Sequence, residues 1–112
     1  MPIFVVHAVD KPKEGPAIRA ENRPAHLEWA AELGEKLRVA GPLLSDDSEQ
    51  MVGSLLIIEF SDLQALKAHM QTDPYVKAGL FERMEIRPYK WLIGNTRQPS
   101  LETQEGHSRD QI

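Results

Sequence analysis

The pattern of hydrophobic and polar positions predicts two clear strands, one over residues 3–9 and one over residues 51–60. Residues 3–9 are mostly β-branched, aromatic or small, and they end at a polar Asp10, which is typical of a strand. Residues 51–60 predict a strand with two apolar faces, because successive side chains point to opposite sides. One face carries Val52, Leu56, Ile58 and Phe60, and the other carries Leu55 and Ile57.

Between these strands, apolar and small residues recur at helical spacing: Leu27, Ala30, Ala31, Gly34 and Leu37. The spacing predicts a helix that begins at Asn22 or Arg23 and has Pro24 at its first position, where a missing N–H has no cost. Gly41-Pro42 is expected to end it. Trp29 falls off the apolar stripe and is expected to cover a loop or a partner subunit. Residues 10–21 are expected to form a polar loop at a pocket edge.

The rest of the chain completes a repeated pattern. The predicted elements are a short strand over 42–45, a helix from Ser61 to about Met70, a helical turn after Asp73-Pro74, and a last strand over 82–92. Ser61 and Gln64 have the spacing of a capping box. Pro88 makes the last strand an edge strand or a bulged one, since proline cannot donate to a strand ladder.

The predicted order β-α-β-β-α-β indicates an α+β, ferredoxin-like fold with an antiparallel sheet. Two helices can cover one face of that sheet, so Leu55 and Ile57 on the other face need a different cover. A second copy packed sheet to sheet provides it, which predicts a homodimer forming a dimeric α/β barrel. We expect residues 1–93 to form this domain and residues 94–112 to form a polar tail.

Composition and charge exclude several classes of protein. The 112 residues carry 13 Lys and Arg, 17 Asp and Glu and a net charge of −4, so no basic surface for nucleic acid is expected. The chain has no cysteine, which excludes disulfides and thiolate chemistry. No apolar run is long enough to cross a membrane, and the N-terminus does not resemble a signal peptide. A soluble cytoplasmic domain is the expectation.

Two residues far apart in the sequence suggest acid–base chemistry. His26 lies at the edge of the predicted helix face, above Ala30 and Leu33, and Asp73 precedes a helical turn about fifty residues later. A carboxylate that accepts from one imidazole nitrogen fixes the tautomer and makes the other nitrogen a better base. Both residues also have structural interpretations: a histidine on a helix edge often only packs, and Asp73 can serve as a helix N-cap.

Other side chains complete the candidate site. Arg19 and Arg23 could hold a substrate carboxylate or phenolate, although surface arginines commonly bind nothing, and Tyr75 could line the same pocket or pack in the core. The remaining histidines, His7, His69 and His107, show no metal-site spacing, and His69 is expected to be solvated. No glycine-rich phosphate loop and no Gly-x-Ser-x-Gly element is present, so we expect no metal and no cofactor.

Several short motifs together resemble the YCII-related family of small dimeric α/β-barrel proteins. They are Arg23-Pro24-Ala25-His26-Leu27, Ala40-Gly41-Pro42-Leu43, Gly53-Ser54, the segment 73–80 and Ile86-Arg87-Pro88. The resemblance implies a ferredoxin-like fold, a homodimer, and a histidine and an aspartate with an enzymatic role, which correspond to His26 and Asp73. Trp29-Ala30 stands where relatives often have a tyrosine-leucine pair.

Two functions from different classes fit these observations. The first is a cofactor-independent lyase or isomerase of a small polar or aromatic molecule, with His26 as general base and Asp73 as its orienting group. The second is a non-catalytic dimeric module that binds a ligand in the same cleft. A stability role for the pair, in a protein that acts through its tail, is a third possibility.

Overall fold

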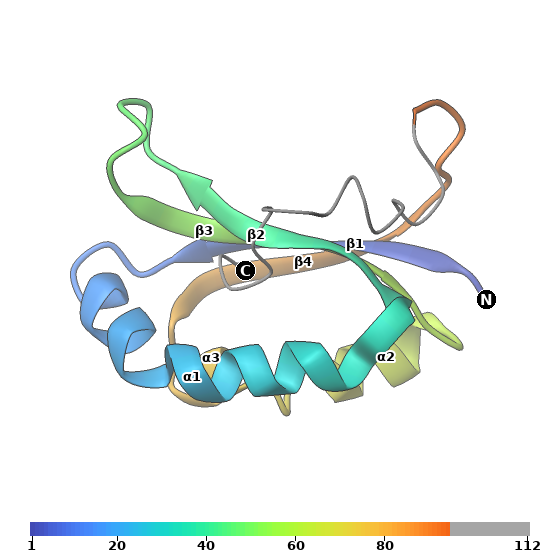
Figure 1. The fold of residues 1–112 in the computed structure, drawn as a ribbon, viewed down its shortest axis with the longest axis horizontal. Helices are drawn as coiled ribbons and strands as arrows, with labels where there is room; N and C mark the ends of the chain where they lie inside the picture. The colour runs from blue at the N-terminus through green and yellow to red at the C-terminus, as the bar shows by residue number, and fades with distance from the viewer. Residues whose placement is uncertain (95–112) are drawn as a thin grey trace, which may run out of the picture.

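The computed structural model, which describes residues 1–94, has an antiparallel sheet with all of its helices on one face (Figure 1). The elements are β1 (Ile3–Asp10), α1 (Gly15–Leu33), the 3₁₀ turn η1 (Gly34–Lys36), β2 (Leu37–Leu44), β3 (Met51–Glu59), α2 (Leu63–Met70), α3 (Pro74–Lys77) and β4 (Phe81–Tyr89). None of the described helices is both long enough and apolar enough to span a bilayer.

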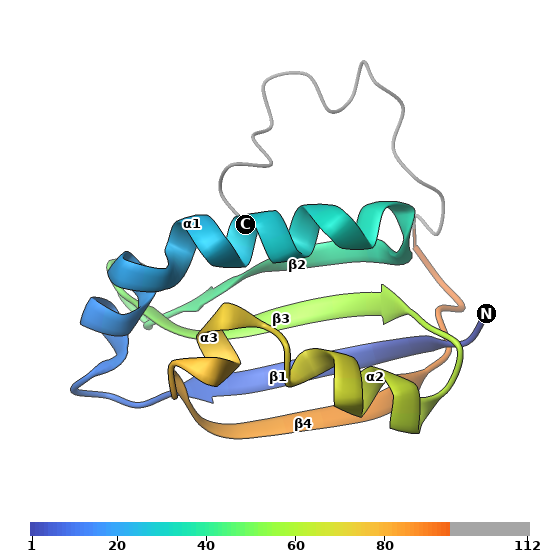
Figure 2. The same cartoon turned by 90° about the horizontal axis from the view of Figure 1, so that it is seen from below.

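The strand order is β2-β3-β1-β4, with every neighbouring pair antiparallel. Figure 2 looks at the helical face, where α1 lies along β2 and β3 while α2 and α3 lie along β1 and β4. This order, with two helical segments as crossovers, is the ferredoxin-like arrangement. The predicted fold class is confirmed.

The core fills the space between the sheet and the helices. β1 buries Phe4, Val6 and Ala8 at alternate positions, and β3 buries Leu56 and Ile58 in the same way. The helices contribute Trp29, Ala30, Leu33, Leu66 and Met70 to this cluster. The predicted inner face of β3 is therefore correct at Leu56 and Ile58.

The first helix begins earlier than the sequence suggested. The expected loop over 10–21 is wrong beyond residue 14, because α1 starts at Gly15 with Pro16 in its first turn. Pro16 thus has the helix-starting role that we assigned to Pro24, and Pro24 lies inside the helix. A proline there removes one backbone hydrogen bond and bends the axis, and the first turns of α1 are inclined to the rest (Figure 1).

The first helix also ends earlier than predicted. Gly34 has φ 59° and ψ −132°, a conformation that stops the helix after Leu33. Gly41-Pro42, expected to end the helix, instead lies inside β2. β2 is an edge strand, so one side of its backbone has no neighbouring strand to bond. A proline is tolerated there because its missing N–H does not interrupt a ladder on that side.

The second strand was predicted over 42–45 but spans Leu37–Leu44, because α1 ends early at Gly34 and residues 37–41 pair with β3 instead of continuing the helix. The other boundaries were close to their predicted positions. The N-cap of α2 is Asp62 and not Ser61, since the Asp62 side chain accepts from the backbone N–H of Ala65 at 2.7 Å. β4 ends at Tyr89 rather than at residue 92. Pro88 lies in this strand, and β4 is an edge strand as its proline required. The predicted tail lies almost entirely outside the described residues.

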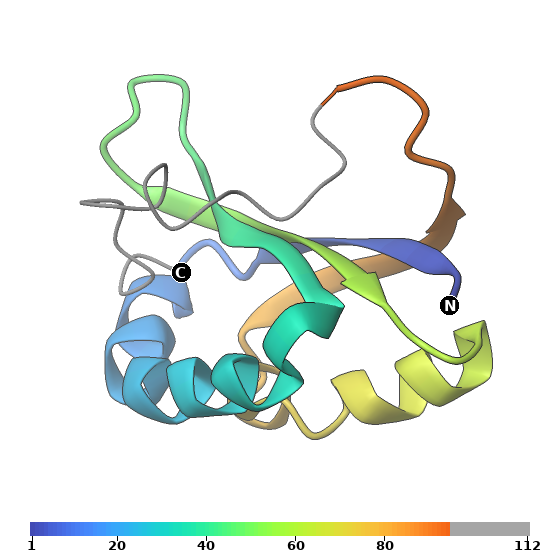
Figure 3. The ribbon, with the colours of Figure 1, turned by 45° about the vertical axis from the view of Figure 1, so that its right-hand side comes forward.

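The second face of the sheet carries no helix. Val5 in β1 and Leu55 and Ile57 in β3 alternate with core residues and point to this side. The turn between β2 and β3 and the segment after β4 rise at its two ends (Figure 3). We call this surface the open sheet face, and its cover by a second copy stays a prediction.

Candidate functional site

His26 and Asp73 meet beneath the sheet. The Nδ1 atom of His26 lies 2.8 Å from Oδ1 of Asp73, and the two residues are 5% and 1% exposed. No other hydrogen-bond partner for the imidazole occurs among the residues that the structure describes. Because Nδ1 is occupied by a carboxylate, Nε2 is the nitrogen that can exchange a proton with a ligand.

Asp73 reaches His26 because it also caps α3. Its Oδ1 accepts the backbone N–H of Tyr75 at 3.0 Å, as expected of an N-cap before Pro74. We expected each carboxylate oxygen to take one of these roles, yet both bonds converge on Oδ1. One oxygen has two lone pairs, so it can accept from both donors. The cap fixes the carboxylate that holds His26.

Aromatic rings pack against the imidazole. The rings of His26 and Tyr75 are stacked, with centroids 4.0 Å apart, and the ring of Trp29 lies 5.9 Å from that of His26. Trp29 donates its Nε1–H to Oγ1 of Thr72 at 2.8 Å. These contacts leave the imidazole little freedom to rotate.

The expectations that Trp29 lies off the buried face and that His69 is solvated were wrong. Trp29 is 7% exposed and packs in the core, where it also contacts the loop between α2 and α3 through Thr72. His69, expected in solvent, is half-buried between Trp29 and Phe60, with ring centroids 5.3 Å and 5.2 Å away. Trp29 on α1 and His69 on α2 thus shield each other from solvent across the helical face.

Arg19 lies in α1, not in a loop, and it is buried. Its guanidinium donates to both carboxylate oxygens of Asp10, from Nε at 2.6 Å and from Nη2 at 3.1 Å. Nη2 also contacts the carbonyl oxygen of Gly53 at 2.6 Å and Oγ of Ser54 at 2.9 Å. These four hydrogen bonds join α1 to β1 and β3, so a direct role of Arg19 in holding a substrate stays a prediction.

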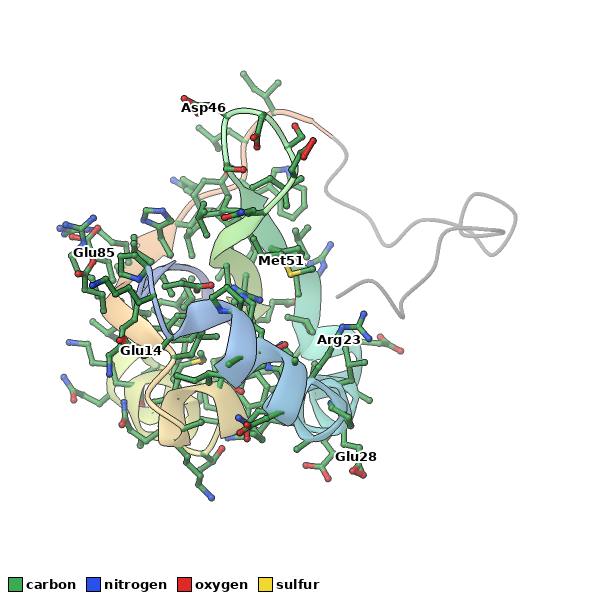
Figure 4. All side chains as sticks on the ribbon, turned by 90° about the vertical axis from the view of Figure 1, so that its left-hand side faces the viewer. Glu14, Arg23, Glu28, Asp46, Met51 and Glu85 are labelled. Atoms are coloured by element: carbon green, nitrogen blue, oxygen red, sulfur yellow. The ribbon has the colours of Figure 1, made fainter. Side chains whose placement is uncertain are left out.

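A pocket opens between α1, α3 and the β2–β3 hairpin. It encloses about 330 Å³, counting space open to solvent. Its polar lining comprises Arg19, Arg23, His26, Ser54 and Tyr75, and its apolar lining comprises Ala40, Gly41, Pro42, Met51 and Leu56. Figure 4 shows Arg23 and Met51 on the same side of the molecule. The pocket brings together four predicted site residues, with Asp73 behind His26.

Tyr75 is buried, with 2% of its surface exposed. Burial raises the pKa of its phenol above the ordinary value, because the phenolate would lose its solvation. The positive charges of Arg19 and Arg23 work against this rise. The ring is at once part of the core, a stacking partner of His26 and a wall of the pocket.

Asp10 and Ser54 were not predicted from the sequence to be site residues. Both lie on strand positions that face the helices, as the register partners Ala8 and Ser54 show. A polar residue at an inward-facing strand position is the signal that would have found Ser54, because buried polar groups require partners. No group of three or more His, Asp or Glu side chains arranged for a metal ion occurs among residues 1–94.

Residues 3–90 match the YCII-related domain. The chain belongs to the YCII-related family. Protein YciI of Escherichia coli O6:H1 is 36% identical over 95 residues, which cover 79% of this chain and 96% of that protein. An uncharacterised protein of Haemophilus influenzae is 32% identical and is covered to 95% of its length, against 78% of this chain. The family resemblance expected from the sequence is confirmed.

Solved structures with the same fold include an enzyme. The 5-chloro-2-hydroxyhydroquinone dehydrochlorinase TftG of Burkholderia phenoliruptrix, in complex with 2,5-dihydroxybenzoquinone, aligns with TM-score 0.69 and 31% identity, covering 82% of this chain and 95% of that chain. A putative antibiotic biosynthesis monooxygenase of Bacteroides thetaiotaomicron aligns with TM-score 0.54 and 17% identity, over 88% and 95% of the chains. The second likeness concerns the fold alone.

Proposed function

We propose that this protein is an enzyme that moves a proton on a small polar or aromatic molecule, in a reaction of the lyase or isomerase type. The observation that carries the proposal is the 2.8 Å contact between His26 and Asp73 at the wall of a pocket. A buried carboxylate on Nδ1 directs the proton of the neutral ring to that nitrogen. Nε2 then serves as the general base.

The chemistry of an elimination follows from this arrangement. Nε2 of His26 takes a proton from the substrate, and the imidazolium that forms is stabilised by Asp73. The electron pair left on the substrate forms a new double bond as the leaving group departs with its own pair. In an isomerisation, His26 returns the proton to a different atom of the substrate. The similarity to a dehydrochlorinase at 31% identity supports the first version.

The test measures chloride release from 5-chloro-2-hydroxyhydroquinone, the compound in the name of the related dehydrochlorinase. His26→Asn is the informative variant, because its amide can still donate to Asp73 but has no atom at Nε2. We expect it to lower kcat/KM by about 10²–10⁴-fold, the usual contribution of a general base. His7→Asn makes the same change at a histidine on the open sheet face, outside the pocket, and it should leave the rate unchanged.

Equal activity of the wild type and His26→Asn would contradict the proposal. If the wild-type protein binds the compound but releases no chloride from it, the non-catalytic ligand-binding module becomes the better account. The site favours catalysis over that alternative because Nε2 lacks a protein partner among the described residues.

A further inference from the structure

Ser54 is a buried hydroxyl with one fixed neighbour. It lies on the helix-facing side of β3, opposite Ala8 in the strand register, and it is 6% exposed. Its Oγ lies 2.9 Å from Nη2 of Arg19. A guanidinium has donors only, so Oγ must be the acceptor in this contact.

The proton of Ser54 must therefore point elsewhere. In the part of the chain that the structure describes, no acceptor for this hydroxyl is found. Ser54 lines the same pocket as His26, so the pocket is the space where an acceptor can sit. A hydroxyl that accepts from a cation is also a stronger donor, because hydrogen bonds in a chain polarise one another.

Arg19 is held firmly enough to aim this hydroxyl. Asp10 takes two of its bonds and the Gly53 carbonyl takes another, and both side chains of the pair are nearly buried. These three bonds do not involve Ser54, so they would keep the guanidinium in place if the hydroxyl were removed. Asp10 and Arg19 thus hold the Ser54 hydroxyl in a fixed orientation.

The polar lining of the pocket selects the acceptor. The described lining includes Arg19 and Arg23 and no carboxylate, and Asp10 offsets the charge of Arg19 through two hydrogen bonds. A hydroxyl donor that is polarised by a guanidinium, in a lining without a carboxylate, favours an anionic oxygen. The stacked rings of Tyr75 and His26 and the apolar side chains of Met51 and Leu56 suit a flat molecule.

We propose that Ser54 is a ligand-binding residue, which donates a hydrogen bond to an enolate or phenolate oxygen of a planar ligand in this pocket. The inference rests on the proposed function for the location of the site. It goes further by assigning the substrate class, an anionic ring oxygen, and the group that binds that oxygen.

Calorimetric titration with 2,5-dihydroxybenzoquinone, which is ionised at neutral pH, tests the assignment. Ser54→Ala should weaken binding by about 10- to 100-fold, the cost of losing a hydrogen bond to a charged group. Ser54→Thr keeps the hydroxyl and should bind nearly as the wild type does. Ser61→Ala, at an exposed serine outside the pocket, is the matched control and should have wild-type affinity.

Three results would overturn the assignment: unchanged affinity in Ser54→Ala, equal losses in Ser54→Ala and Ser54→Thr, or no binding of the anion by the wild type. The outcome is separate from that of the proposed function. A loss of affinity in Ser54→Ala with no chloride release by the wild type would support the Ser54 assignment and contradict catalysis. Unchanged affinity in Ser54→Ala, together with chloride release that depends on His26, would support catalysis and contradict the Ser54 assignment.

Discussion

Single side chains in this molecule combine structural and chemical roles. Asp73 caps α3 and holds His26 through the same oxygen atom. Arg19 joins α1 to the strands β1 and β3, and it also donates a hydrogen bond to Ser54. Tyr75 fills the core and forms part of the pocket wall. A site built from core residues is rigid, which suits a reaction that needs a proton donor and acceptor in fixed positions.

The buried phenol of Tyr75 predicts a pH dependence at alkaline pH. Its pKa is raised by burial in the native state, whereas in the unfolded chain it ionises near the ordinary value of about 10. The stabilising contribution is complete below that pH. It is lost as the pH rises through the native pKa, since the unfolded state gives up its proton first.

Subtracting the ultraviolet titration of Tyr75→Phe from that of the wild type isolates this group. The difference should show phenolate absorption only above the ordinary range. Urea unfolding should show a free energy of unfolding that falls above pH 10 more steeply in the wild type than in Tyr75→Phe. A difference spectrum with a midpoint at or below 10 would contradict the burial argument.

At the scale of elements, β1, β3 and α2 were predicted closely, whereas β2 and α1 were not. β1 and β3 have alternating apolar residues bounded by polar ones, and their sequence limits agree with the structure to within a residue. α1 was misplaced at both ends, because Pro24 and Gly41-Pro42 looked like helix boundaries. Tertiary packing overrode these local signals: Pro24 is accommodated by a bend, and Pro42 by an edge strand.

The candidate site was only partly predictable for a related reason. His26 and Asp73 were found from their local context and from the family resemblance, and the structure brings them together. The Asp10–Arg19–Ser54 group could not be found, because its members come from three elements and meet only after the sheet and α1 have packed. Misplacing the start of α1 put Arg19 in a loop and hid this contact.

Gly34 provides a test of how α1 ends. Its φ of 59° is unfavourable for any side chain, while the space around it is empty, so Gly34→Ala adds strain without a clash. We expect the free energy of unfolding to fall by about 1–3 kcal/mol. Gly41→Ala, which also meets no atom within 4 Å and has no positive φ, is the matched control.

Urea unfolding followed by tryptophan fluorescence, with both variants at one protein concentration, gives the comparison. The control should change stability by at most about 1 kcal/mol. Equal effects of the two substitutions would show that the left-handed conformation at Gly34 is not what ends the helix.

For the whole molecule, the main question is what covers the open sheet face. Val5, Leu55 and Ile57 are only half-buried there, on the side of the sheet away from the helices (Figure 1). A sheet with apolar residues on both sides needs a second layer. We propose that a second copy supplies it, in a two-fold symmetric sheet-to-sheet dimer.

Leu55→Glu tests the dimer by placing a charge at the centre of this face. Burying an unpaired carboxylate is strongly unfavourable, so we expect the variant to sediment as a monomer at micromolar concentration while the wild type sediments as a dimer. Ala25→Glu introduces the same side chain at an exposed position of α1 and should remain dimeric. A wild-type protein that is monomeric in analytical ultracentrifugation would contradict the proposal.

The tautomer of His26 tests the central claim most directly. Multiple-bond ¹H–¹⁵N NMR of the labelled protein, at a pH where the ring is neutral, distinguishes the two ring nitrogens. The contact with Asp73 predicts a proton on Nδ1 and a bare Nε2. Asp73→Asn should allow both tautomers, because an amide can offer either its oxygen or its NH₂ group. A wild-type spectrum with the proton on Nε2 and a bare Nδ1 would contradict the account.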